Sequence, residues 1–332
     1  MGAAVSRPFF YATRPHPPVA DPEKIGNSRH GNHTGLVMDL RAIAMGLAFA
    51  FIWSSAFTSA RIIVADASPL FSLAVRFLIS GILGVAIATV MGQSWRLTRS
   101  QWYATILFGI CQNALYLGLN FYAMQTVEAS VAAIIASTMP LLVALAGWLL
   151  FRERLRPLGV VGLLAGFAGV ALIMSSRISA GIDLFGVALC GLGALALTFA
   201  TLAVRGATSG GNFMMVVGLQ MFVGSAVLFV AAPLFETIYV RPTWPLALAF
   251  TYTTLFPGLL ATLIWFLLLN RIGPIRAATF HFLNPVFGVT IAAILLGERL
   301  GAMDAVGVAV TTLGILAVQL SRQPVQRSSA ST

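Results

Sequence analysis

The sequence predicts an all-α polytopic membrane protein, in which ten transmembrane helices form two inverted five-helix repeats around a central cavity. Hydrophobic residues make up 58% of the 332 positions and charged residues only 9%, whereas soluble domains carry about 25% charged residues. A chain so poor in charge cannot present a solvated surface. In addition, segments 151–155 (FRERL) and 296–300 (LGERL) share the sequence Glu-Arg-Leu, and their residues Glu153 and Glu298 are 145 positions apart. Self-similarity at a fixed offset indicates a duplicated unit.

Ten apolar runs account for the predicted helices, since a membrane-spanning helix needs about 20 mostly apolar residues. Helix-breaking or interfacial residues such as Pro69, Pro157 and the pair Gly273-Pro274 separate several of these runs. The first repeat is therefore predicted at 39–176 and the second at 177–321. In chain order the runs are 40–62, 69–91, 101–122, 128–151, 157–176, 184–204, 213–234, 244–269, 277–297 and 303–321.

The basic residues predict that both termini lie in the cytoplasm. With the N-terminus inside, 15 of the 20 Lys and Arg residues fall in cytoplasmic segments, four fall outside, and Arg76 lies within a span. This placement between apolar runs also argues against nucleic-acid binding. Each repeat holds an odd number of helices, so the second repeat enters the membrane in the opposite direction, an arrangement typical of alternating-access transporters.

The two ends of the chain are predicted to be polar cytoplasmic segments. Segment 1–38 is rich in proline and has no apolar run, which predicts a disordered N-terminal arm. Segment 322–332 is the corresponding cytoplasmic tail. Translation starting at Met38, directly before the first span, is an alternative to a start at Met1.

Ionisable groups within a membrane are costly, and few occur within the predicted spans. None of the ten acidic residues lies in the middle of a span, which favours facilitated transport over coupling to protons or sodium, with His281 as an alternative route for coupling. We interpret Arg76 as a gating or structural residue, with an anion partner for substrate as the other interpretation. Pro140 and Pro285 each remove one backbone hydrogen bond, and the resulting kinks are either hinges or purely structural.

Polar side chains within the spans are the candidate substrate contacts. Asn113, Tyr116 and Asn120 form one stripe on the third predicted helix, at spacings of three and four residues, which favours cavity lining over helix packing. His281 and Asn284 share a face of the ninth helix, and His281 either contacts substrate or bonds a neighbouring helix. The remaining candidates are Trp53, Ser54, Ser137 and Trp265.

No motif for catalysis or cofactor binding is found in the sequence. It has no P-loop, no histidine cluster within a span and no paired aspartates for magnesium, so we expect neither an enzyme nor a bound metal or cofactor.

Several segments resemble the EamA branch of the drug/metabolite transporter superfamily: Trp53-Ser54-Ser55-Ala56-Phe57, Arg76-Phe77-Leu78, Asn284-Pro285-Val286-Phe287-Gly288 and the two Glu-Arg-Leu segments. The resemblance covers residues 40–321, and Ser54 departs from the glycine more usual there. It implies a cavity lined by helices 1–4 and 6–9, with helices 5 and 10 peripheral.

Within this superfamily the chain is most similar to YddG-type exporters of aromatic amino acids. The resemblance implies a protein of a bacterial inner membrane, with a small neutral or zwitterionic metabolite as substrate and the lipid bilayer as surroundings. The glycines of the fifth and tenth helices, among them Gly162, Gly169, Gly307 and Gly314, permit close packing either within a monomer or in a dimer. A broad exporter of drugs or toxic cations is an alternative, and a non-transporting membrane scaffold is an alternative from another class.

Overall fold

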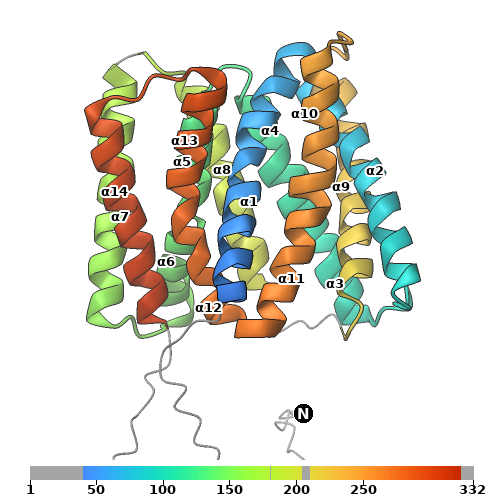
Figure 1. Cartoon of the computed structure of the whole chain (residues 1–332), viewed down its shortest axis with the longest axis horizontal. Helices are drawn as coiled ribbons and strands as arrows, with labels where there is room; N and C mark the ends of the chain where they lie inside the picture. The colour runs from blue at the N-terminus through green and yellow to red at the C-terminus, as the bar shows by residue number, and fades with distance from the viewer. Residues whose placement is uncertain (1–39, 180, 204–209, 323–332) are drawn as a thin grey trace, which may run out of the picture. The chain divides into compact units, whose positions relative to one another are not determined.

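The computed structural model of the protein describes residues 40–179, 181–203 and 210–322. The predicted N-terminal arm, the alternative start at Met38 and the tail beyond Arg322 lie outside these residues. The described chain is almost entirely helical, and ten of its helical stretches are long and apolar enough to cross a membrane (Figure 1). This confirms the predicted fold class, while the inversion of the second repeat stays a prediction.

Six of the ten spans are single α-helices. The first, α1, extends to Asp66, four residues beyond its predicted end, and the others lie within three residues of their predicted bounds. These helices are α1 (Leu40–Asp66), α2 (Pro69–Val90), α7 (Pro157–Ser179), α8 (Leu184–Ala203), α9 (Phe213–Phe235) and α14 (Ala302–Ser321).

Four spans are interrupted, where the sequence predicts continuous helices. The third consists of α3 (Arg99–Phe108), the π-helical segment η1 (Gly109–Leu117) and α4 (Gly118–Ala123). The eighth consists of α10 (Trp244–Leu255), the π-helical η2 (Phe256–Leu260) and α11 (Ala261–Ile272). Such π-helical turns are rare and occur frequently at functional sites.

The fourth and ninth spans are interrupted just before the two prolines. The fourth consists of α5 (Ala129–Ser137) and α6 (Met139–Phe151), and the ninth of α12 (Pro274–Thr279), the 3-10 turn η3 (Phe280–Leu283) and α13 (Asn284–Leu296). Pro140 and Pro285 are thus each the second residue of a new helical segment. A proline removes a hydrogen bond to the residue four positions earlier and disfavours helix at the residue before it, so the break in regular helix falls just before each proline.

The boundaries of the helices recur at the same offset of 145 as the sequence motif. Both the first and the last residue of α6 are matched at this distance by those of α13. The residue that follows each helix, Arg152 or Gly297, is in the left-handed conformation, with φ of 54° and 68°. The repeat is therefore present in local structure as well as in sequence.

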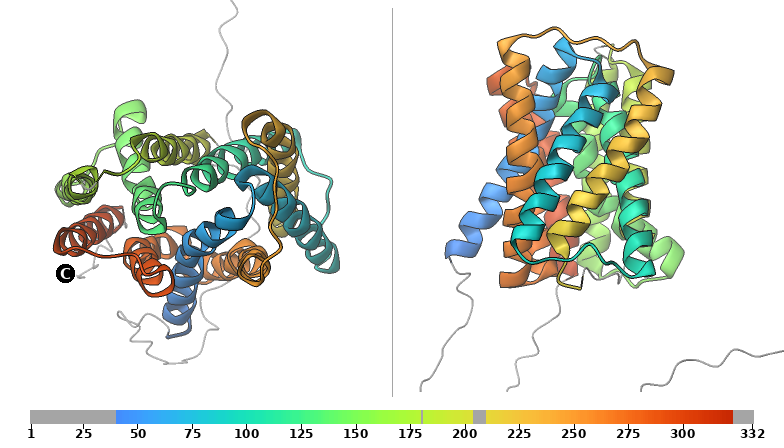
Figure 2. Two further views of the ribbon diagram at one scale, coloured as in Figure 1. Left: turned by 90° about the horizontal axis from the view of Figure 1, so that it is seen from above. Right: turned by 90° about the vertical axis from the view of Figure 1, so that its right-hand side faces the viewer.

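Two antiparallel helix pairs lie at opposite edges of the bundle (Figures 1 and 2). At one edge α7 packs on α14, with Gly162 against Gly314 and Gly169 against Gly307. At the other edge α2 packs on α9, where Ser225 Oγ donates a hydrogen bond to the carbonyl of Ala74 at 2.8 Å. Close approach at small residues is a usual means of helix association in membranes. The glycine stripes of α7 and α14 are therefore used within one chain.

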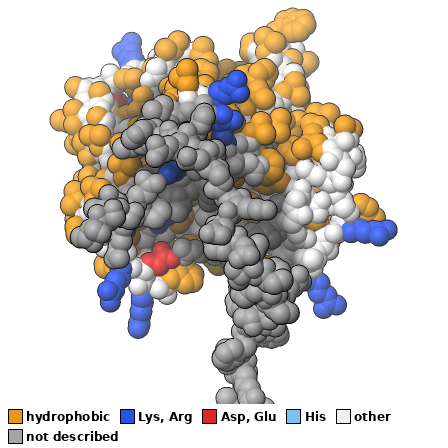
Figure 3. All heavy atoms as spheres, turned by 60° about the horizontal axis from the view of Figure 1, so that its bottom comes forward, with side chains coloured by type: hydrophobic (Ala, Val, Ile, Leu, Met, Phe, Trp, Pro, Cys, Tyr) orange, Lys and Arg blue, Asp and Glu red, His pale blue; other side chains and the backbone are white. Residues whose placement is uncertain are grey.

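The two ends of the bundle differ in charge. We call one the arginine-rich end, because the described residues there include Arg41, Arg96, Arg99, Arg152, Arg154, Arg156, Arg271, Arg276 and Arg322. Figure 3 shows basic side chains projecting from the rim of this end, next to largely hydrophobic flanks. The other we call the acid-rich end, because Asp66, Glu128, Asp183, Glu236, Glu298 and Asp304 lie there. The sequence predicts that the arginine-rich end faces the cytoplasm.

Candidate functional site

Two connected chambers lie between the helices in the interior of the bundle. The outer chamber has a volume of about 550 Å³ and reaches the arginine-rich end at Gln101, in the first turn of α3, and Phe213, the first residue of α9. The inner chamber, about 60 Å³, lies deeper, between α1, α2, η1, α4 and η2. Trp53, Asn113 and Met221 are among the residues that line both. The two chambers therefore form one path from the middle of the bundle to one end.

Aromatic rings form one side of the outer chamber. The ring of Phe49 lies 4.7 Å from that of Trp265, 5.3 Å from that of His281 and 5.7 Å from that of Trp53, measured between centroids. Trp265 and His281 are also in edge contact, at 5.1 Å. We call these four residues the aromatic wall. They come from α1, α11 and η3, so both halves of the chain contribute to it.

His281 is also positioned by a neighbour on its own helix. Its Nδ1 lies 3.0 Å from Nδ2 of Asn284, at the spacing of three residues that the sequence indicates. Ser54 of α1 donates to the backbone carbonyl of Asn284 at 3.3 Å. Ser54 and Asn284 therefore join α1 to α13, and neither lines the two chambers.

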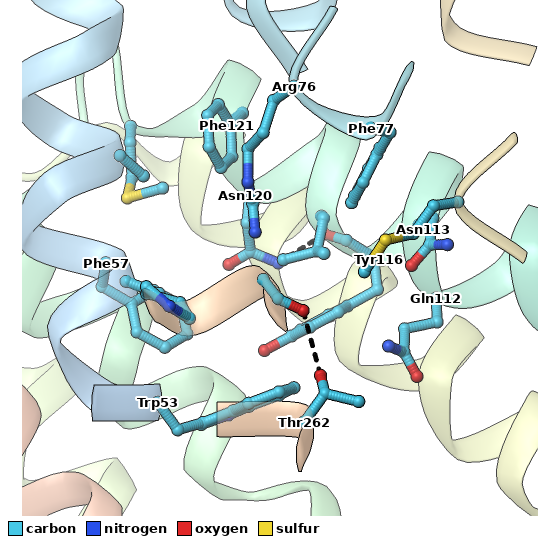
Figure 4. A pocket seen from close by; sticks show the side chains of 17 residues that line it. Trp53, Phe57, Arg76, Phe77, Gln112, Asn113, Tyr116, Asn120, Phe121 and Thr262 are labelled. Carbon is cyan, nitrogen blue, oxygen red and sulfur yellow. Dashed lines mark hydrogen bonds between the residues drawn. The ribbon is translucent and has the colours of Figure 1, made fainter. Parts of the chain in front are cut away.

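The inner chamber is lined by polar side chains from the second and third spans (Figure 4). Arg76 comes from α2, Tyr116 from η1 and Asn120 from α4, and their exposed fractions are 5%, 3% and 1%. Asn120 Nδ2 donates to the carbonyl of Tyr116 at 2.7 Å, while its Oδ1 is buried without a hydrogen-bond partner. The polar stripe predicted on the third span thus faces a cavity in the structure.

Amide side chains lie where the two chambers meet. Gln112 and Asn113 line both chambers, and Gln220 of α9 lines the outer one. Asn113 Nδ2 donates to the carbonyl of Gln220 at 2.9 Å, joining η1 to α9. The lining of both chambers is mainly apolar, with these amides where the chambers meet, and it includes Arg76 but no Asp, Glu or Lys.

Of the remaining predicted site residues, Ser137 does not line either chamber. Its hydroxyl donates to the carbonyl of Ala133 within α5, at 2.6 Å. Pro140 and Pro285 are likewise absent from both linings. Within the described residues there is no group of three or more His, Cys, Asp or Glu side chains that could hold a metal ion.

The structure also places in the cavity residues that the sequence analysis does not select, namely Phe49, Gln220, Met221 and Thr262. Phe49 lies four residues before Trp53 and therefore on the same face of α1. This spacing is the signal by which the sequence could have identified it. The others come from helices with no polar stripe, and only packing brings them to the cavity.

Polar contacts join the helices at the acid-rich end. Arg177 of α7 forms ion pairs with Glu128, before α5, and with Asp304 of α14, the latter at 2.9 Å. Glu298 accepts hydrogen bonds of 2.8 and 3.0 Å from the first two backbone N–H groups of α5. Glu236 accepts bonds of 3.1 and 2.8 Å from N–H groups in the first turn of α2. Carboxylates at helix N-termini complement the helix dipole and the unpaired N–H groups.

Two carboxyl groups at the acid-rich end have shifted pKa values. Burial raises the pKa of its carboxyl above the usual value, Arg177 opposes the shift, and Glu298 and Asp304 add to it. Nearby, a hydrogen bond from Thr126 lowers the pKa of Asp183.

In the described part of the chain, a bundle of ten apolar helices with an internal cavity that reaches one end defines a polytopic membrane protein with a candidate internal binding site, the class that includes membrane transporters. The EamA-like transporter family model matches residues 40–175 and 184–320, and the chain belongs to this family. It is therefore a membrane transporter built from two copies of the family's unit.

The chain is also similar to several curated proteins and to a solved structure. The uncharacterized transporter YvbV of Bacillus subtilis is 26% identical over 259 residues, 77% of this chain and 85% of the relative. The uncharacterized inner membrane transporter YedA of Escherichia coli K12 is 27% identical over 278 residues (82% and 88%), and protein PecM of Dickeya dadantii 25% over 274 residues (81% and 89%). A solved crystal structure of another protein shares the fold, with a TM-score of 0.61 and 22% identity over 85% of this chain and 98% of its own.

Proposed function

We propose that this transporter exports aromatic and other apolar amino acids, and similar neutral metabolites, by alternating access across a bacterial inner membrane, with both termini in the cytoplasm. The observation that carries the proposal is the aromatic wall beside a cluster of amides in a cavity without a carboxylate. An apolar or aromatic side chain is matched by offset and edge contacts with the four rings. The amides supply hydrogen bonds that fix the orientation of a polar group.

The open end of the cavity is the end from which an exporter takes up its substrate. The cavity reaches the arginine-rich end. At the acid-rich end, the helices are joined to one another by the ion pairs of Arg177 and by the helix caps of Glu236 and Glu298. With the arginine-rich end in the cytoplasm, this is the state that takes up substrate from inside. Export then requires the contacts at the acid-rich end to break while the arginine-rich end closes.

Transport down the substrate gradient is supported by the cavity lining. Neither chamber is lined by an Asp or Glu side chain, and a carboxylate within the membrane is the usual means of exchanging a cation for a substrate. His281 is the residue in the outer chamber through which a proton could be coupled.

Counterflow in proteoliposomes tests the function. Vesicles loaded with unlabelled phenylalanine should accumulate labelled phenylalanine transiently, and Trp53→Ala and Trp265→Ala should lower the rate because each removes a ring of the aromatic wall. Trp244→Ala is the matched control, since Trp244 is 82% exposed at the start of α10 and lines neither chamber. Absence of counterflow with every apolar amino acid would contradict the proposal. An imposed pH gradient that drives accumulation would contradict the facilitated mechanism.

A further inference from the structure

We propose that Arg76 binds the carboxylate of the substrate in the inner chamber, so that a free carboxylate is required of everything this protein carries. The inference rests on the proposed function and specifies which chemical group of the substrate is recognised. It assigns to Arg76 a role in binding, where the sequence analysis favours gating or structure.

The first argument is the position of Arg76 in the membrane. It lies seven residues beyond Pro69, or about 10 Å along α2 at 1.5 Å per residue. An arginine near a membrane face can extend its charged group to the interface. Arg76 is instead 5% exposed and lines the inner chamber, where Figure 4 shows its side chain beside Asn120. Its guanidinium therefore faces the cavity, away from the lipid headgroups.

The second argument is that, within the described part of the chain, Arg76 forms no ion pair. Its Nε is buried without a hydrogen-bond partner. The guanidinium lies 5.2 Å from the centre of the Phe77 ring. A cation–π contact offsets only a small part of the cost of burying a charge. Guanidinium groups bind carboxylates through two parallel hydrogen bonds, so an anionic group of a ligand is the complementary partner.

The third argument is an acceptor next to this cation. Oδ1 of Asn120 is also buried without a partner, and it lines the same chamber. A cation and an acceptor, both unsatisfied, match the carboxylate and the ammonium of an amino acid zwitterion. The inner chamber, about 60 Å³, has room for this small polar group, while the side chain would extend past Trp53 into the outer chamber.

The same arrangement excludes cationic drugs as preferred ligands. A ligand with a positive charge and no carboxylate would be repelled by Arg76, and the lining of the two chambers offers no carboxylate to receive it. The expected order of binding is therefore phenylalanine first, with phenylalaninamide and phenethylamine far weaker.

The test measures binding of phenylalanine and of phenylalaninamide to the purified full-length protein, together with phenylalanine counterflow. We expect the wild type to prefer phenylalanine by at least tenfold. Arg76→Gln should weaken phenylalanine binding by tenfold or more and should not weaken phenylalaninamide binding, because the repulsion of its ammonium is removed with the charge, so that the preference is lost. A merely structural role would weaken both ligands equally, and an unchanged preference in Arg76→Gln would overturn the inference.

A second variant acts on Arg76 without removing it. A Cβ at Gly258 would lie 3.6 Å from Arg76 Nη2, so Gly258→Asp places a carboxylate of the protein beside the guanidinium. Gly258→Asn adds equal bulk without the charge. We expect the aspartate variant to lose phenylalanine binding at least fivefold more than the asparagine variant. Equal losses would overturn the inference.

The outcomes separate this inference from the proposed function. Counterflow of phenylalanine by a wild type that binds phenylalaninamide equally well would retain the function and overturn the role of Arg76. A wild type that neither binds nor transports any apolar amino acid would overturn both.

Discussion

Replacing Gly314 by alanine tests the close contact between the backbones of α7 and α14. The added Cβ would lie 2.4 Å from the backbone N of Gly166 and 2.7 Å from the carbonyl O of Gly162. Ordinary contacts begin at 3.4 Å, so α7 and α14 would have to separate by about 1 Å, because backbone atoms cannot rotate out of the way. Overpacking of this kind costs about 1–3 kcal/mol.

The matched control is Gly191→Ala in α8, where a Cβ would meet nothing within 4 Å. Alanine gains about 0.5–1 kcal/mol over glycine in a helix, and this gain is common to both variants. The difference between their unfolding free energies should therefore equal the overpacking cost, about 1–3 kcal/mol, with Gly314→Ala the less stable. Unfolding by SDS in mixed micelles, followed by circular dichroism, measures it. Equal stabilities would show that α7 and α14 do not approach as described.

Three further predictions concern the ends of the bundle. Because burial raises the pKa of Glu128 in the closed state, that state holds the proton more tightly than an open state with a solvated carboxyl. Lowering the pH toward this pKa should therefore favour the closed state and slow counterflow. Glu128→Gln should abolish this dependence on pH. Faster counterflow at acidic pH would contradict the prediction. Glu236→Ala leaves two N–H groups of α2 without their acceptor and should cost about 0.5–2 kcal/mol of unfolding free energy, whereas an equal loss in Glu236→Gln, which keeps an acceptor oxygen, would argue against capping. Arg152→Gly should stabilise the protein by about 1 kcal/mol and Gly297→Ala should destabilise it by a similar amount, since both positions are left-handed. Thermal unfolding in detergent measures both changes. Changes of the opposite sign would show that the backbone is not strained at these two positions.

The ten spans could be predicted because apolar length is a direct requirement of the bilayer. The interruptions within spans could not be predicted equally well. The segments η1 and η2 arise where one residue more than a regular turn is accommodated, which leaves no signature in hydropathy. Pro140 and Pro285 mark the interruptions in the fourth and ninth spans, and the irregular turn lies just before each of them, where a proline disfavours regular helix.

The polar residues of the cavity lining could be predicted from the sequence, because polar groups are costly to bury in a membrane. Arg76 and the stripe from Asn113 to Asn120 are selected by their polarity alone, and all line a chamber. Ser54 and Asn284 illustrate the limit of that reasoning, because two polar groups that bond to each other across helices satisfy the same requirement as cavity lining. Phe49 illustrates the opposite limit, since an aromatic residue in an apolar helix stands out only once its neighbours are known.

The contact between α7 and α14 has the form of an isologous interface. Gly162 meets Gly314 and Gly169 meets Gly307, and the offset of 145 exchanges one pair for the other. Such reciprocity is what a two-fold axis imposes on identical subunits, and nothing in it requires the helices to belong to one polypeptide. Two separate five-helix chains with these glycines, inserted in opposite directions, would close on each other through this contact. Joining them in one chain fixes the stoichiometry and frees each copy to diverge, as Arg152 and Gly297 have at one equivalent position.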